Sequence, residues 1–140
     1  MTRRFDLARG AMPFGFRRHD VDRLELAAAQ HGQRHRALEA MIGAPVHPLR
    51  FRANLYVAGW PAWAELDLVG RDVAVGPTAR LKVVKRIVRC AATNVDPDTG
   101  IRDLTIPDTL MQNLGHTDCG VYGEVIDGGT IATGDEVNMP

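Results

Sequence analysis

Residues 80–100 read RLKVVKRIVRCAATNVDPDTG, and this stretch joins an apolar run, a cysteine and a tight turn. Apolar and basic residues alternate through most of its first half, which is typical of a half-buried β-strand. In residues 96–100 proline presets its own backbone angle, the aspartates bond nearby amides, and glycine tolerates a positive φ. The pattern therefore predicts a strand over 80–88 and a turn over 96–100, with Cys90 between them.

The position of Cys90 allows two interpretations. A thiol at the mouth of a strand is a nucleophile or metal ligand when nearby cations favour the thiolate, and a small core residue when nothing does. Four cations precede it, of which the alternation places only some on its own side: Lys82, Lys85, Arg86 and Arg89. The residues alone leave both interpretations open.

The second cysteine, Cys119, lies between an aspartate and a glycine without a comparable group of cations. We expect it to be a core or loop thiol. A disulfide between Cys90 and Cys119 stays open, because the sequence does not give the separation of their α-carbons.

Short strands separated by turn residues make up most of the remaining pattern. We expect them at residues 51–58, 71–75, 121–126, 130–133 and 136–138, with hairpin loops at 76–77 and 128–129. Trp60 and Trp63, on either side of Pro61, are expected to form a hydrophobic plug. Many short strands in one small domain favour a mainly β barrel or sandwich.

Two helices are expected beside the strands. The apolar spacing over 22–42 predicts a helix that is firmer in its second half, residues 35–42, and closed by Gly43. Pro107 and Gly115 mark the beginning and end of a second helix over 107–114. The first 20 residues show no periodicity and are expected to be a loose tail.

Arg50, Arg52 and Asn54 fall on one side of the expected strand over 51–58, because strand side chains alternate. Such a row of donors suits a phosphate or another planar anion, since arginine offers a rigid fork of N–H groups. The alternative is an ordinary solvated sheet face.

The histidines indicate less. His31 and His35 are four residues apart and share a helical face, but no third metal ligand lies nearby, so we expect a partly exposed helix face. His116, in a loop beside Asp118, is a weaker candidate for a ligand contact.

The composition limits the class of protein. A chain of 140 residues suits one domain, and its 17 basic residues balance its 17 acidic residues. No overall field would draw it to nucleic acid or to a membrane surface. The beginning of the chain shows no apolar segment of signal-peptide length, so we expect a cytoplasmic protein with both thiols reduced.

Three segments together resemble the MOSC domain, named for the C-terminal domain of molybdenum cofactor sulfurases. They are RFRANLYVAGWPAWAELDLVGR (50–71), LKVVKRIVRCAATNVDPDTGIRD (81–103) and GVYGEVIDGGTIATGDEV (120–137). The resemblance implies a mainly β fold, a distorted MOSC-type β-barrel with a few short helices, over residues 35–140. Residues 1–34, an N-terminal tail with a partial helix, do not look like the longer N-terminal region of relatives.

The resemblance also implies a site. Cys90 matches the reactive cysteine of the family, which carries sulfur as a persulfide in cofactor sulfurases and binds molybdenum in amidoxime-reducing relatives. Arg52 and Asn54 match positions that hold the molybdopterin and its phosphate, and Tyr122 matches a tyrosine near the site. We add Arg89, next to Cys90, to the expected cofactor-binding residues. Ala53 stands where many relatives have proline.

Three functions follow from the resemblance as expectations. The first is binding of a molybdenum cofactor (molybdopterin) or sulfur transfer on Cys90; the second is molybdenum-dependent reduction of N-hydroxylated compounds, with electrons from a partner protein. The third is a non-catalytic barrel module with an incomplete site. Pyridoxal phosphate is linked with the wider family through a fused desulfurase domain, which this chain is too short to contain, so we expect any cysteine desulfurase to be a separate partner.

Overall fold

The protein is mainly β, as predicted, with a few short helices. The structure, a computed structural model, describes residues 2–4, 23–28 and 32–138. Its strands are β1 (Thr2–Arg4), β2 (Arg23–Ala28), β3 (Leu55–Val57), β4 (Asp72–Val75), β5 (Ala79–Val88), β6 (Asp118–Asp127) and β7 (Glu136–Asn138). Its helices are α1 (Gln33–Ile42) and α2 (Ile106–Leu114), with the 3-10 turns η1 (Pro48–Phe51), η2 (Ala64–Leu68) and η3 (Ala91–Asn94).

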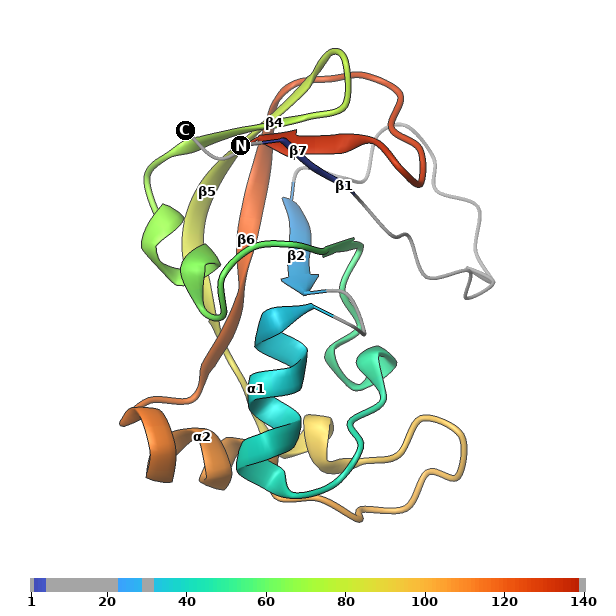
Figure 1. The fold of residues 1–140 in the computed structure, drawn as a ribbon, viewed down its shortest axis with the longest axis vertical. Helices are drawn as coiled ribbons and strands as arrows, with labels where there is room; N and C mark the ends of the chain where they lie inside the picture. Colours follow the sequence, from blue (N-terminus) through green and yellow to red (C-terminus); the bar gives the residue numbers. More distant parts are fainter. Residues whose placement is uncertain (1, 5–22, 29–31, 139–140) are drawn as a thin grey trace.

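The strands form one sheet in the order β1-β7-β4-β5-β6-β2-β3. Among the described residues no pairing joins the two edge strands, β1 and β3, so the sheet is not closed into a barrel. It is distorted, because the β5–β6 ladder shifts register at three places along its length. Figure 1 shows β5 and β6 along the long axis, with β4 and β7 at one end and α1 and α2 at the other.

The β4–β5 hairpin follows directly from local sequence and is confirmed. Val75 pairs with Ala79 across the turn, which passes through Gly76 at a φ of 62°. Alternate side chains face inward, because strand side chains point to opposite faces of the sheet. Val73, Leu81 and Val83 are buried, whereas the basic residues between the apolar positions of β5 are exposed.

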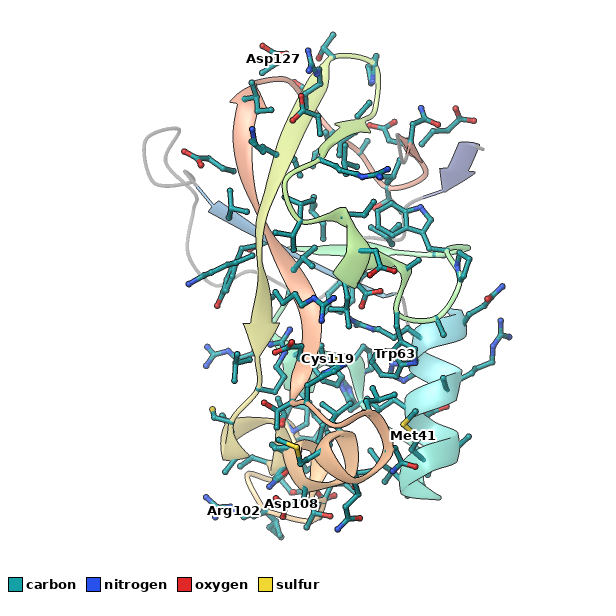
Figure 2. The ribbon with its side chains drawn as sticks, turned by 90° about the vertical axis from the view of Figure 1, so that its left-hand side faces the viewer. Met41, Trp63, Arg102, Asp108, Cys119 and Asp127 are labelled. Carbon is teal, nitrogen blue, oxygen red and sulfur yellow. The ribbon has the colours of Figure 1, made fainter. Side chains whose placement is uncertain are left out.

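The core has two parts. The larger, which we call the sheet core, lies on the inner face of the sheet: Leu55, Val57, Trp60, Leu66, Leu68, Val73, Val75, Ala79, Leu81, Val83, Val121 and Val137. The smaller, the helical core, gathers around α1 and α2: Leu38, Val46, Phe51, Ile106, Leu110 and Cys119. Trp63 packs against both, so the expected tryptophan plug joins the two cores. Figure 2 shows Trp63 and Cys119 at the level where the sheet meets the helices.

Both helices end as their sequences predict. α1 ends at Gly43, whose φ of 77° allows its N–H to donate to the Glu39 carbonyl at 2.7 Å. α2 has proline in its first turn and ends at Gly115 in the same left-handed conformation.

Outside the segment around Arg50, three expectations about secondary structure are wrong in part. The first half of the helix expected over 22–42 is the strand β2, because its backbone pairs with β6 and β3 instead of bonding within itself. In the expected tail, Thr2–Arg4 is a strand paired with β7, and residues 5–20 lie outside the described residues. Residues 130–133 form no strand, and β6 is instead paired with β5 and β2. The division of the chain between residues 34 and 35 stays a prediction.

Candidate functional site

Cys90 lies where the sequence places it, just beyond the end of β5 and directly before η3. Its side chain is exposed, and both cysteines are free thiols. Its carbonyl accepts hydrogen bonds from Thr93, at 3.2 Å from the backbone N–H and 2.9 Å from Oγ1. The backbone of Cys90 is thus held while its sulfur faces solvent.

Arg89 connects this segment to η1. Its side chain is buried, its Nε donates to the Cys119 carbonyl at 2.7 Å, and its Nη1 donates to the Phe51 carbonyl at 3.1 Å. The same guanidinium lies 5.3 Å from the centre of the Phe51 ring. Because Phe51 precedes Arg52 in the chain, Arg89 brings the Cys90 segment next to the Arg52 turn. Its expected contact with a cofactor stays a prediction.

Arg52 adopts a left-handed conformation after η1, with φ 50° and ψ 36°. A non-glycine residue in this region is strained, and such strain concentrates at functional sites. The Arg52 side chain is exposed, and within the described part of the chain its guanidinium has no hydrogen-bond or ion-pair partner. The backbone of Arg52 therefore has a fixed conformation in the turn, and its guanidinium lies in solvent.

The expected row of donors on one strand face is not present. Pro48–Phe51 is a 3-10 turn and β3 begins only at Leu55, so the alternation assumed for Arg50, Arg52 and Asn54 does not apply. Arg50 is buried and Arg52 is exposed, while Asn54 is partly buried between η1 and β3. The segment is a turn and not a strand for a local reason. The side chain of His47 caps the turn, and Pro48 suits the first turn of a helix better than a strand.

The turn over residues 96–100 has the predicted chemistry. Asp96 Oδ1 accepts hydrogen bonds from the backbone N–H groups of Asp98 at 2.7 Å and Thr99 at 3.1 Å. These two bonds, from Asp98 first and then Thr99, lower the pKa of the Asp96 carboxyl. Gly100 closes the turn at a φ of 71°.

Tyr122 lies in β6, in the part of the strand that pairs with both β5 and β2. It pairs with Lys85 across the β5–β6 ladder, and the Lys85 ammonium is 5.2 Å from the centre of its ring. Cys90 is five residues beyond Lys85, which corresponds to roughly 16 Å of strand length. The bonds of Arg89 connect the Cys90 segment to the Arg52 turn. Tyr122 lies across β2 from the segment of Asn54, because it pairs with Glu25, and β2 pairs in parallel with β3 from Leu26 and Leu55.

A buried polar cluster lies beneath the site, and the sequence did not reveal it. Arg34 of α1 and Glu65 of η2 form an ion pair at 2.8 Å, with both side chains buried. The Phe51 ring lies within 5.8 Å of the Arg34 guanidinium as well as near Arg89. Residues 31 positions apart make this pair, so no local pattern could have indicated it.

Cys119 belongs to this buried region, as expected for a core thiol. It is fully buried, and burial raises the pKa of its thiol, although the positive charges of Arg34 and Arg89 act in the opposite direction. Because Cys119 faces the core and Cys90 faces solvent, the two cysteines have opposite roles in the fold.

The histidines form no metal site in the described part of the chain. There, no group of three or more histidine, cysteine or acidic side chains is placed to hold an ion. His35 is buried instead of lying on an exposed helix face, with its Nε2 3.3 Å from Glu39 Oε1; His31 lies outside the described residues. His116 accepts a hydrogen bond from the Asp118 amide at 3.0 Å, so it caps a turn.

Cys90 and Arg52 expose side chains that have the chemistry to bind a soft metal and an anion, respectively. Cys90 supplies an accessible sulfur, the ligand type that soft metals select. Arg52 supplies an exposed guanidinium, whose geometry matches phosphate oxygens. This pairing is also suited to sulfur chemistry on a negatively charged substrate, because the thiolate is the nucleophile and the guanidinium attracts the anion.

The family model for the MOSC domain matches residues 24–138. No curated protein is similar enough to the chain to be matched to it. No helix among the described residues has the length and apolar character needed to cross a membrane.

Proposed function

The chain belongs to the MOSC domain family, and from this membership and the exposed side chains of Cys90 and Arg52, whose backbone segments Arg89 connects, we propose that it acts on a molybdenum cofactor. In this proposal Cys90 is the reactive atom, either as a sulfur carrier or as a ligand of the metal. Arg52 and Asn54 bind the anionic part of the cofactor. A cysteine desulfurase or an electron donor is a separate protein partner.

One observation carries the proposal. The side chains of Cys90 and Arg52 are both exposed. The buried side chain of Arg89 connects their two backbone segments through its bond to the Phe51 carbonyl. An exposed thiol alone does not indicate a site. An exposed thiol whose neighbour Arg89 bonds to the turn of a strained, exposed arginine, in a family whose known functions involve the molybdenum cofactor, does support one.

The sulfur-transfer step uses only residues of this chain and a persulfide donor. The Cys90 thiolate attacks the outer sulfur of a donor protein persulfide, a new S–S bond forms at Cys90, and the S–S bond of the donor breaks. The donor leaves as its own thiolate, so no external oxidant or reductant is needed. Arg52 stabilises negative charge on the acceptor, and Asn54 contributes a neutral amide donor.

When bound, the molybdenum cofactor would supply a metal centre that exchanges electrons. Cys90 would hold it through sulfur and Arg52 through its anionic group. These residues bind and orient the cofactor.

The test measures both forms of loading on the whole chain. Incubation with a cysteine desulfurase, cysteine and pyridoxal phosphate should add the mass of one sulfur atom, read by intact-mass spectrometry. Protein made in a host that synthesises the cofactor should contain molybdenum by metal analysis. At least one signal is expected in wild type, and it should be absent from Cys90→Ser.

The matched control is Cys119→Ala, which keeps Cys90 as the only thiol. Because Cys119 is buried, this variant should keep the wild-type signal. If wild type and Cys90→Ser are indistinguishable in both measurements, the proposal is wrong.

A further inference from the structure

Arg50 is a buried guanidinium with three partners on one neighbouring segment. Its Nη2 lies 2.8 Å from Asp103 Oδ1 and 3.7 Å from Asp96 Oδ2, and its Nη1 donates to the Thr93 carbonyl at 3.4 Å. Only 3% of its side chain is exposed. These partners lie in η3 and at the two ends of the loop that follows Cys90.

The bond to Thr93 connects Arg50 to the reactive cysteine. Thr93 accepts from Arg50 through its carbonyl and donates to the Cys90 carbonyl through both its N–H and its Oγ1. A guanidinium in η1 is thus two hydrogen-bonded steps from the backbone of Cys90. Arg50 also lies two positions before Arg52 in the chain. One residue is therefore connected to the backbone of Cys90 and to that of Arg52.

The aspartates fix the loop at its base. Asp96 begins the turn and Asp103 ends the return segment, where Val95 and Arg102 form an isolated antiparallel bridge. A buried guanidinium needs such charged partners, because an unpaired charge in the interior is costly. An arginine can serve a carbonyl and two carboxylates at once through its fork, whereas a lysine offers a single point charge.

We infer that Arg50 is a positioning residue that sets the place of the Cys90 sulfur relative to the Arg52 guanidinium, acting through Thr93 and the loop base. This role rests on the proposed function, because it gives the pair Cys90 and Arg52 its purpose. Arg50 itself is buried and does not touch the ligand.

The test compares alkylation of Cys90 by iodoacetate, an anion, with alkylation by iodoacetamide, which is neutral. Both reagents react with the thiolate, so the ratio of their rates cancels the ionised fraction and reports the positive charge near the sulfur. Arg52→Gln should lower this ratio by about threefold, the size expected when one nearby charge is removed in a partly solvated site. Cys90→Ser gives the blank, since Cys119 is buried.

Arg50→Lys decides the inference. It keeps the charge and loses the fork, so a positioning role predicts a fall in the ratio of about twofold or more, close to that of Arg50→Gln. The double variant Arg50→Lys with Arg52→Gln should fall no further than Arg52→Gln alone. Arg80→Lys, at an exposed ion pair with Asp72 and Asp127, is the matched control and should keep the wild-type ratio. A wild-type ratio in Arg50→Lys would overturn the inference, because charge alone would then suffice.

A second pair of variants tests the step from Thr93 to Cys90, on which the inference depends, even if the Arg50 variants do not fold. Thr93→Val removes the hydroxyl bond to the Cys90 carbonyl, and Thr93→Ser keeps it. Thermal unfolding verifies that each variant is folded. The inference predicts a lowered ratio in Thr93→Val and a wild-type ratio in Thr93→Ser; equal ratios in both would overturn it. These rates require no cofactor, so their outcome is separate from the loading experiments that test the proposed function.

Discussion

Two arginines separated by a single residue have opposite surroundings. Arg50 is buried against the loop after Cys90, and Arg52 is exposed in a left-handed conformation. The strained backbone at Arg52 costs stability of the order of 1 to 2 kcal/mol, because a Cβ in this region approaches its own chain. A residue that is strained and exposed contributes little to folding, which is consistent with a role in binding.

Replacement of Arg52 by glycine should separate stability from function. Glycine accepts a positive φ, so the variant should unfold within about 1 kcal/mol of wild type, with relief of strain offset by the greater freedom of the unfolded chain. In our proposal Arg52 binds the anionic group, so loading with sulfur or molybdenum should fall in this variant. Urea unfolding measures the effect on stability, and the loading measurements of the proposed function measure the effect on binding.

The control is Arg36→Gly, on the exposed side of α1. There glycine should cost about 1 kcal/mol, because it weakens a helix, and loading should be unchanged. Full loading of Arg52→Gly would show that Arg52 is not an anion donor.

At the scale of elements, α1 is fixed to η2 by the buried pair Arg34 and Glu65. Glu65→Gln leaves the Arg34 charge without its carboxylate in the interior, and we expect a loss of about 3 kcal/mol in the free energy of unfolding. Chemical denaturation measures the loss. Asp67→Asn, on the same turn, should change stability by less than about 0.5 kcal/mol, because its pair with Arg86 is 3.7 Å long and Asp67 is largely exposed. Equal losses in the two variants would contradict this account of η2.

Elements defined by neighbouring residues were predicted well. The β4–β5 hairpin, α2 and the turn over 96–100 are set by glycine, proline and aspartate within a few positions, and each is confirmed. The segment around Arg50 was predicted wrongly as a strand. Its apolar and basic residues alternate like a strand, but Pro48 and the cap by His47 begin a 3-10 turn there.

β2 shows the other limit of local patterns. Its spacing fits one face of a helix, and the preference for a strand comes from partners far away in the chain, β6 and β3. The periodicity of a sequence contains no information about such partners, because they come next to the strand only when the sheet forms.

At the scale of the whole molecule, stability should depend on the charge of His35. Burial lowers the pKa of this histidine, opposed by the carboxylate of Glu39 and reinforced by the charge of Arg34. The folded state therefore binds a proton less readily than the unfolded chain, in which a histidine titrates at about 6.5. The contribution of neutral His35 is fully present above that pH and is lost as the pH falls towards its lower folded pKa.

We expect urea midpoints to decrease between about pH 7 and pH 5, and His35→Gln to lose part of this slope. The comparison of slopes is the measurement, since the substitution also changes stability at every pH. An identical slope in wild type and His35→Gln would show that the histidine does not contribute.

The sequence by itself determined the mainly β character, the α2 helix, the position of Cys90 between a strand and a turn, and the resemblance to the MOSC domain, which the match over residues 24–138 confirms. These features depend on alternation, turn residues and motif order, which lie within short stretches of chain. Only the tertiary structure decided the order of strands, the open edges of the sheet and the opposite surroundings of Arg50 and Arg52. Those depend on contacts between residues tens of positions apart, such as Arg50 with Asp103, and burial that arises from such contacts leaves no periodic signal in the chain.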